Sequence, residues 1–277
     1  MSAKLALFKA LDRPGLRWAL DPIATVFVSA TKRQWCVVRR EGPLFLHHYD
    51  GAVLVQPAVG GDDPAGRDTK TRDDFFYDHT PGPGDTVLDV GAGIGGEALT
   101  FSKLVGPNGR VVCIEGHPAT AHALRRLVEL NHLENVTVLP LAVGQQAGLV
   151  FMSDDTVDHL GNSVRGDADS GPAVPVLPLD LIIADLGLDR VDFLKMNIEG
   201  AEVDALNGMS ANLASVGHVA ISCHDFLADA GADDAVRTRA PVESLLCDNG
   251  FDVVHRIDRR PWLADTLYGS NAAATER

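Results

Sequence analysis

A glycine-rich loop directly after a short apolar segment limits the folds open to this chain more than any other feature. Residues 86–90 read Thr-Val-Leu-Asp-Val, and the next six positions carry glycine at 91, 93, 95 and 96. Glycine permits a tight turn and lets a ligand approach the backbone closely. In an open α/β sheet such a loop lies at the carboxyl end of a strand, where ligands bind. The segment therefore predicts an α/β fold with a ligand site after its first strand.

Strand-like and helix-like segments alternate along the rest of the chain. Short apolar runs predict strands at residues 86–90, 110–115, 135–143, 191–196, 218–223, 251–257 and 266–268. Apolar residues at helical spacing predict helices at 96–105, from Pro118 onward, at 202–209 and at 241–249. Such alternation is typical of a mostly parallel sheet with helices on both faces. We therefore expect a Rossmann-like sheet of seven strands within residues 81–277.

Residues 1–80 lack this alternation and predict a separate N-terminal extension. Asp50-Gly51 lies between two apolar runs within residues 45–55, which indicates a hairpin. Residues 60–66 predict a loop, and residues 72–77 could begin a helix that leads into the main domain. We expect this extension and a long polar loop at 153–172 to act as a lid or to shape a substrate pocket.

Composition argues against several classes of partner. The formal net charge is −14 at pH 7, and nucleic-acid binding depends on Lys and Arg, so a broad nucleic-acid surface is not expected. The four cysteines (Cys36, Cys113, Cys223 and Cys247) form no Cys-x-x-Cys pair and predict neither a zinc site nor a disulfide framework. No apolar stretch reaches the length of a transmembrane helix. These features predict a cytoplasmic protein, and a homo-oligomer is compatible with them.

Two carboxylates flank the predicted ligand loop and bear on the identity of the ligand. Gly91, Gly93 and Gly96 satisfy the G-x-G-x-x-G pattern of dinucleotide sites, so an NAD-dependent oxidoreductase must be considered. Asp89 precedes the first glycine, and a carboxylate there does not favour a pyrophosphate at a helix N-terminus. A carboxylate does suit S-adenosylmethionine, which carries an amino group and a sulfonium but no phosphate. Glu115 ends the next strand, where it could bind ribose hydroxyls in either cofactor.

Four motifs in order favour the methyl donor over the dinucleotide. Residues 88–95 read LDVGAGIG, residues 112–118 read VCIEGHP, residues 141–144 read LAVG, and residues 191–202 read VDFLKMNIEGAE. With these motifs the chain resembles the FkbM family of methyltransferases. The resemblance implies a class I methyltransferase fold and S-adenosylmethionine as the cofactor. It also implies O-methylation of a hydroxyl on a small molecule, natural product, sugar or glycolipid.

The resemblance further implies which residues hold the cofactor. Leu141 and Ala142 would lie near the adenine, and Asn162-Ser163 would belong to a short element that closes over the cofactor. The loop glycines and the two strand-end acids would contact the rest of the molecule. The complete set is Asp89, Gly91, Gly93, Gly95, Glu115, Gly116, His117, Leu141, Ala142, Asn162, Ser163 and Asn197.

Three residues near the ends of later strands are candidates for the chemistry. Methyl transfer to a hydroxyl requires alignment and removal of the hydroxyl proton. His224 directly follows a predicted strand, and histidine titrates in the range that suits a general base. Asn197 stands where the family usually has aspartate and cannot act as a base, whereas Glu199 follows it at the same strand end.

A divalent cation and two other functions stay open at this point. Asn197, His224 and Asp225 could ligate Mg²⁺, but a set with one carboxylate does not favour a tight metal site. An NAD-dependent oxidoreductase is opposed by Asp89 and by the absence of a recognisable Tyr-x-x-x-Lys pair. A non-catalytic protein that binds S-adenosylmethionine is suggested only by Asn197. The favoured function is an O-methyltransferase with a small-molecule or glycan acceptor.

Overall fold

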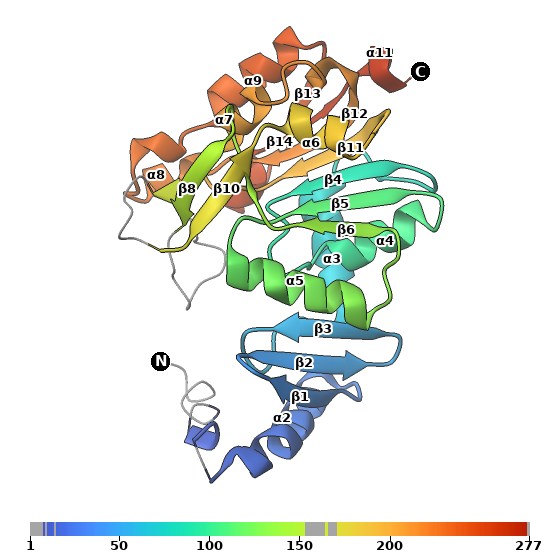
Figure 1. Cartoon of the computed structure of the whole chain (residues 1–277), viewed down its shortest axis with the longest axis vertical. Coiled ribbons are helices and arrows are strands. Elements are labelled where there is room, and N and C mark those ends of the chain that lie inside the picture. The colour runs from blue at the N-terminus through green and yellow to red at the C-terminus, as the bar shows by residue number, and fades with distance from the viewer. Residues whose placement is uncertain (1–7, 9, 14, 153–163, 166–170, 276–277) are drawn as a thin grey trace.

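The computed structural model contains a large α/β domain and a smaller N-terminal unit (Figure 1). It describes residues 8, 10–13, 15–152, 164–165 and 171–275. Its helices are α2 (Arg17–Lys32), α3 (Pro64–Phe75), α4 (Ala98–Val105), α5 (Pro118–Leu130), α6 (Leu179–Asp185), α7 (Glu202–Asn207), α8 (Asp225–Asp229), α9 (Arg239–Asp248), α10 (Pro261–Ala264) and α11 (Ala272–Thr275), with short 3-10 turns at Leu213–Ser215 and Asp234–Val236. Its strands are β1 (Val37–Glu41), β2 (Leu44–Tyr49), β3 (Ala52–Gln56), β4 (Thr86–Val90), β5 (Arg110–Ile114), β6 (Val136–Leu139), β7 (Ala142–Val143), β8 (Gly148–Met152), β9 (Val164–Arg165), β10 (Ala173–Leu177), β11 (Val191–Met196), β12 (Val216–Ser222), β13 (Asp252–His255) and β14 (Thr266–Ser270).

Seven of these strands form the central sheet, in the order β13-β14-β12-β11-β4-β5-β6. Neighbours pair in parallel except at β14, which runs antiparallel to both β12 and β13. From β4 the chain proceeds outward through β5 and β6, and it later returns to place β11 on the other side of β4. The switch point between β4 and β11 is the place where α/β sheets bind ligands. The predicted seven-stranded, mostly parallel sheet is confirmed.

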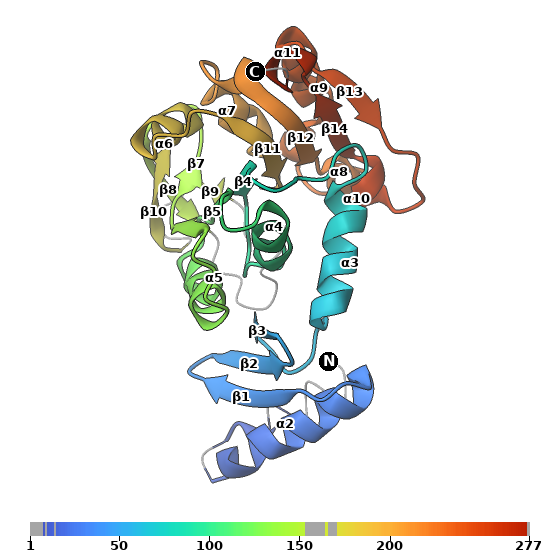
Figure 2. The same cartoon turned by 90° about the vertical axis from the view of Figure 1, so that its right-hand side faces the viewer.

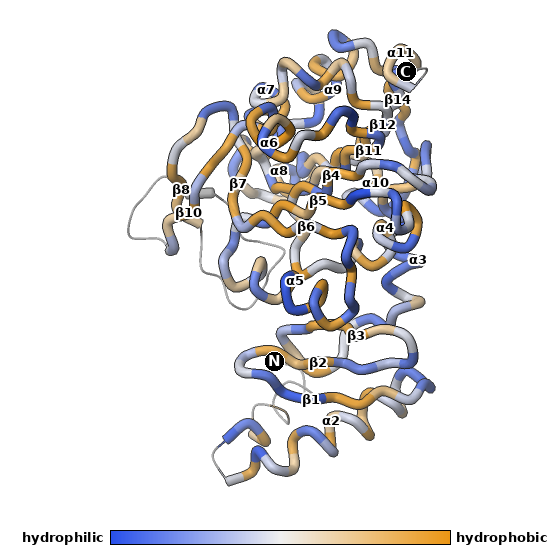
Figure 3. The backbone as a smooth tube through the Cα atoms, turned by 45° about the vertical axis from the view of Figure 1, so that its right-hand side comes forward, coloured by the Kyte–Doolittle hydropathy of each residue, from blue (hydrophilic) through white to orange (hydrophobic). Residues whose placement is uncertain are grey.

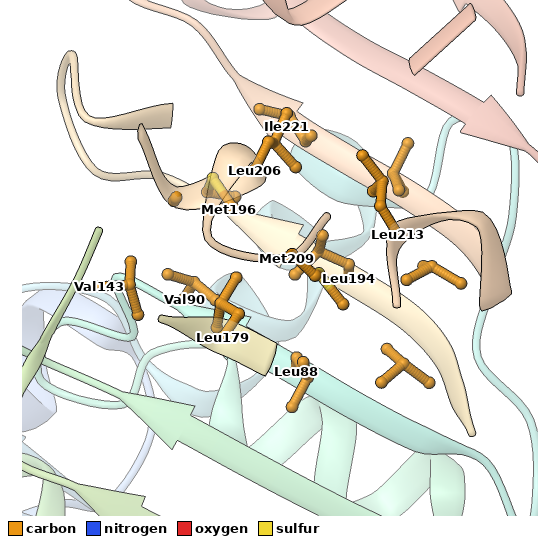
Figure 4. Close-up of a cluster of buried hydrophobic side chains, with 14 of the residues drawn as sticks. Leu88, Val90, Val143, Leu179, Leu194, Met196, Leu206, Met209, Leu213 and Ile221 are labelled. Carbon is orange, nitrogen blue, oxygen red and sulfur yellow. The ribbon is translucent and has the colours of Figure 1, made fainter. Parts of the chain in front are cut away.

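Successive residues of each strand face opposite layers of helices. Leu88 and Val90 of β4 point into a cluster of buried apolar residues that includes side chains of α6, α7 and α9 (Figure 4). Val87 of the same strand belongs to the cluster on the other face, with residues of α3, α4 and α5. All six residues of β11 are buried, as expected of a central strand covered on both faces.

The N-terminal unit is a three-stranded antiparallel sheet with α2 on its outer face. Leu20, Ala24 and Val28 of α2 pack against apolar residues of this sheet, and β3 contacts α5 on the other side. The side chain of Asn131, just after α5, joins the two units by accepting from the Val53 amide and donating to the Val53 carbonyl, both at 2.8 Å. Helix α3 then leads from this unit into the large domain (Figure 2). The hairpin predicted around Asp50-Gly51 is confirmed by the pairing of β2 with β3.

The helix predicted to begin at residues 72–77 is wrong in position. Helix α3 begins at Pro64, inside the predicted loop, and ends at Phe75. The Asp63 carboxylate caps it by accepting a hydrogen bond from the Gly66 amide at 2.9 Å. Proline at the first position of a helix loses no hydrogen bond, so Asp63-Pro64 is a start signal despite the surrounding glycines.

The strand predicted at residues 135–143 is wrong in extent. β6 ends in the central sheet at Leu139, whereas β7 pairs in parallel with β10 in a second sheet of order β7-β10-β8-β9. Pro140 lies between them and has no amide hydrogen for a strand ladder. The predicted long loop at 153–172 lies mostly outside the described residues, and its described part includes β9.

Two histidine rings stack between β12 and the segment that leads into β4. The ring centroids of His79 and His218 lie 3.5 Å apart, and the ring planes differ by 3°. Burial lowers the pKa of both histidines, and the opposing attraction of the Asp78, Asp85 and Asp192 carboxylates does not restore it. The folded protein therefore favours two neutral rings.

The free energy of unfolding is expected to decrease as the pH falls through about 6.5, the ordinary pKa of histidine. Below that value the unfolded chain binds protons that the stacked rings resist, so protonation favours unfolding. A His218→Phe variant keeps a ring and should show a flatter pH dependence in denaturant titrations. His122→Gln, on the exposed face of α5, should retain the dependence of the wild type. An unchanged slope in the His218→Phe variant would contradict this assignment.

Candidate active site

A cavity opens at the carboxyl ends of β4, β5 and β11. This position matches the switch point of the central sheet, and the second sheet contributes one wall. The described lining residues are Val90, Gly91, Gly93, Ile114, Glu115, Gly116, Leu141, Ala142, Val143, Met152, Asn197, Ile198, Glu199 and Ala201. The structure therefore gathers predicted cofactor residues from four separate segments, together with the candidate catalytic residues Asn197 and Glu199.

Gly91, the first glycine of the loop, lies where the backbones that follow β4 and β11 touch. Gly91 has φ of 74°, a conformation that favours glycine, and its amide donates to the Ile114 carbonyl at 2.9 Å. A Cβ atom at Gly91 would overlap the backbone oxygen of Asn197 and would lie 2.9 Å from Cγ2 of Ile198. Glycine is thus needed here because the backbones after β4 and β11 meet.

Glu115 is held at the end of β5 by the backbone of the site. Its Oε2 accepts from the Gly93 amide at 2.9 Å, and its Oε1 accepts from the His117 amide at 2.8 Å. Burial raises the pKa of Glu115, although these two amides and Lys195 favour its charged form. Because each carboxylate oxygen can accept a second hydrogen bond, Glu115 can still bind a pair of hydroxyls in the cavity.

Asp89 does not line the described cavity; its carboxylate lies beneath the loop. Oδ1 of Asp89 is 2.8 Å from Nζ of Lys195, and both side chains are almost completely buried. Nζ of Lys195 also donates to the Gly91 carbonyl at 2.8 Å and lies 5.2 Å from the centre of the Phe75 ring. Burial disfavours a charge on Lys195, but the attraction of Asp89 and Glu97 and the hydrogen bond to Asp89 together outweigh it, so the pKa of Lys195 is raised. This ion pair supports the glycine loop from below.

Four other predicted cofactor residues are not among the lining residues. Gly95 faces α5, where an added Cβ would lie 2.6 Å from Cδ1 of Leu124, so its role in the structure is close packing. His117 precedes α5, and its ring nitrogen Nδ1 lies 3.3 Å from the Thr120 hydroxyl. Asn162 and Ser163 lie outside the described residues. Their predicted contacts with a cofactor stay predictions.

The segment after β11 places two candidate catalytic residues at the cavity. The Asn197 amide donates to the Val90 carbonyl at 3.0 Å, whereas its buried side-chain oxygen has no hydrogen-bond partner within the described part of the chain. An unpaired polar atom buried beside a cavity is a candidate to bind a ligand. Glu199 has φ of 52°, a left-handed conformation that costs a non-glycine residue about 1–2 kcal/mol. Such strain is concentrated at functional sites, where the surrounding structure enforces it.

His224 lies behind this segment rather than on the described cavity wall. Its Nδ1 is 3.6 Å from Oε1 of Glu202, which is fully buried. Glu202 accepts hydrogen bonds from the Gly200 amide at 3.0 Å and from the Thr238 hydroxyl at 2.8 Å. Burial would raise the pKa of Glu202, but His224, the backbone amide of Glu202 itself and the Thr238 hydroxyl lower it below its ordinary value. The geometry suits His224 to positioning the backbone next to Glu199.

Residue patterns missed several parts of the site. Lys195 escaped notice because a lysine within an apolar strand gives no sign that its charge is paired beneath a neighbouring loop. Met152 also lines the cavity and lies outside the four motifs, whereas Ile198 and Ala201 line it from within the motif at residues 191–202. No described residue before position 81 lines the cavity, so a lid formed by the N-terminal extension stays a prediction.

The described residues contain neither a group suited to a metal ion nor a helix suited to cross a membrane. No group of three or more His, Cys, Asp and Glu side chains there is arranged to hold a metal ion. No helix in the described ranges combines the length and the apolar character needed to cross a membrane.

Comparison with known proteins identifies the family. The family model described as Methyltransferase FkbM domain matches residues 89–253, more than half of the chain. The chain is 24% identical over 211 residues to Methyltransferase sdnD of Sordaria araneosa. This match covers 65% of this chain and 77% of the relative. It is 33% identical over 117 residues to AMB antimetabolite synthetase AmbE of Pseudomonas aeruginosa, covering 42% of this chain but only 5% of that protein.

One of the solved structures that this chain matches is the methyltransferase FkbM from Methylobacillus flagellatus. Its TM-score is 0.48 at 21% identity, and the match covers 75% of this chain and 50% of that one. The sheet order and the family match agree with the motifs at the carboxyl ends of β4, β5 and β11. The chain belongs to the FkbM family of methyltransferases.

Proposed function

We propose that this methyltransferase uses S-adenosylmethionine to O-methylate a hydroxyl of a small molecule, natural product, sugar or glycolipid. The observation that carries the proposal is the position of Glu199 between two cavities. Glu199 lines the cavity at the switch point, and it also lines a neighbouring cleft bordered by the β7–β8 loop and Asp233. A carboxylate at this junction is suited to meet an acceptor that approaches the cofactor.

In this proposal the first cavity holds the methyl donor. Glu115 binds the ribose hydroxyls, and Leu141 and Ala142 contact the adenine. The loop from Gly91 to Gly93 lets the donor lie against the backbone. Asp89 acts through Lys195, because its carboxylate supports the loop instead of touching the donor.

The neighbouring cleft holds the acceptor in the proposed reaction. The acceptor oxygen attacks the methyl carbon, the bond between that carbon and sulfur breaks, and its electron pair stays on sulfur. Glu199 takes the hydroxyl proton, and the Asn197 side-chain oxygen accepts a hydrogen bond from a bound substrate. His224 is a positioning residue, since it acts on this segment through Glu202.

Isothermal titration and a methyl-transfer assay test this division of roles. The wild-type chain should bind S-adenosylmethionine or its demethylated product and transfer the methyl group to an acceptor in a panel of hydroxyl compounds. Glu199→Gln should lower turnover by about 10²–10⁴-fold, the usual contribution of a general base, while cofactor affinity changes little. Glu134→Gln, an exposed substitution outside the described lining of both cavities, should leave both quantities unchanged.

Three experimental results would each contradict a different part of the proposed function. If the chain binds neither S-adenosylmethionine nor its demethylated product, the proposed methyl-donor site is wrong. Equal losses of cofactor binding and turnover in Glu199→Gln would reject Glu199 as the base. Transfer to carboxylates or amines, with none to hydroxyls, would overturn O-methylation of a hydroxyl.

The same proposal places the enzyme in a reducing compartment, the cytoplasm, without nucleic acid as a partner. All four cysteines are free thiols, and three of them are buried. The net charge of −14 is unfavourable for a broad phosphate-binding surface.

A further inference from the structure

The outward face of α2 is apolar although no described element covers it. Trp18 is 79% exposed, Val26 is 68% exposed and Ile23 is 38% exposed. Trp35, just beyond the helix, is 71% exposed. Isolated exposed apolar residues are ordinary, but a continuous patch marks an interaction surface.

The sequence of α2 shows that this patch is continuous along the helix. Trp18, Pro22 and Val26 recur every four residues and therefore share one face, opposite to the buried Leu20 and Ala24. Pro22, Ile23, Val26 and Phe27 line a shallow, almost wholly apolar hollow on that side. A helix that is apolar on both its inner and outer faces is normally covered on both.

The position of α2 leaves its outer face accessible. Figures 1 and 2 both show α2 at the end of the molecule, beyond the β1–β3 sheet and away from the central sheet. Figure 3 shows apolar stretches along its tube. The cavity at the switch point lies in the other unit of the structure, so a surface bound at α2 would not contact its described lining.

The charge around the patch is opposite to that of the whole chain. The described residues among 10–56 include six lysines and arginines but four aspartates and glutamates, whereas the chain as a whole has a net charge of −14. Arg13, Arg33 and Arg39 are exposed near the two ends of α2 and on the adjoining strand β1. None of the three forms an ion pair with another described residue. An anionic partner is therefore favoured over a second copy of this basic surface.

We propose that α2 and Trp35 form a docking surface for an anionic lipid bilayer. The helix would lie in the interface plane, with Trp18, Ile23 and Val26 among the lipid chains and headgroups. Tryptophan is favoured at such interfaces, and flanking arginines attract anionic headgroups. The protein would be bound at the membrane surface without crossing it. This proposal does not depend on the methyl-transfer reaction.

Flotation of the full chain with lipid vesicles tests the surface directly. Vesicles of phosphatidylcholine mixed with phosphatidylglycerol should bind the wild-type chain, and vesicles of phosphatidylcholine alone should bind it about tenfold more weakly. The double variant W18E/V26E should lose at least about tenfold in partitioning to the anionic vesicles. Ile257→Glu is the matched control, because Ile257 is fully exposed but lies far along the chain, after β13.

A second double variant, R33E/R39E, separates charge from apolar contact and protects the test against a folding defect. It should bind anionic vesicles more weakly while keeping the circular dichroism spectrum and melting temperature of the wild type. Failure of the wild type to bind anionic vesicles would overturn the proposal. So would equal binding to neutral vesicles, or a wild-type dimer that W18E/V26E dissociates, since a second copy would then occupy the face.

Discussion

Replacing Lys195 with methionine is expected to lower the free energy of unfolding by about 3–5 kcal/mol. Methionine fills similar volume, but it leaves the Asp89 carboxylate buried without its partner at 2.8 Å. It also removes the hydrogen bond to the Gly91 carbonyl. Denaturant titration measures the loss, and weaker binding of the methyl donor should accompany it because the loop loses its support.

A double-mutant cycle distinguishes loss of the ion pair from loss of packing. Asp89→Asn combined with Lys195→Met removes both charges, so the double variant should be more stable than Lys195→Met alone by about 1 kcal/mol or more. Arg72→Met is the control, since the Arg72–Asp68 pair is exposed on α3 and should contribute less than about 1 kcal/mol. Additive effects of the two buried substitutions would show that the charges are not coupled.

Gly91→Ala is expected to abolish measurable binding of S-adenosylmethionine and to destabilise the fold by about 3 kcal/mol or more. The added methyl group would collide with the backbone of Asn197, which cannot move without separating β11 from β4. Part of the cost, about 1–2 kcal/mol, comes from the left-handed conformation alone.

The conformational cost can be measured separately at another glycine. Gly187, just after α6, has φ of 57°, and a Cβ atom there would meet nothing within 4 Å. Gly187→Ala should therefore lower the free energy of unfolding by only about 1–2 kcal/mol and should leave cofactor affinity unchanged. Thermal melting and isothermal titration provide both readouts. Similar losses in the two variants would contradict a steric origin for the effect at Gly91.

Much of the fold follows from local patterns in the chain. Apolar runs of strand length alternate with segments of helical periodicity after residue 81. The central sheet is seven-stranded and mostly parallel, as these patterns predict. The predicted bounds are wrong where a single residue fixes the start or the end of an element. Asp63-Pro64 starts α3 inside a glycine-rich stretch, and Pro140 divides one apolar run between two sheets. In both cases proline at one position outweighs the average character of its neighbours.

In the candidate site, too, the sequence indicates which residues are near the cleft, and the structure shows where their side chains point. The sequence predicts Glu115 as a residue of the ligand site from its place at a strand end, because the carboxyl ends of parallel strands meet at one edge of a sheet. His224 has an equally suggestive place in the chain, yet it lies against Glu202 instead of on the described cavity wall. Strand-end position shows which residues are near the cleft, whereas side-chain direction shows which of them reach it.

The alternation of strand and helix patterns, the glycine loop and the four motifs by themselves determined the fold class, the family resemblance and the predicted region of the ligand site. Only the tertiary structure shows where the Asp89 carboxylate lies. On β4, alternation directs Leu88 and Val90 to one helix layer and Asp89 to the other, where Lys195 of the adjacent strand neutralises it. A sequence motif names the residues around a ligand, but the partners available on each face of the sheet decide which of them can touch it.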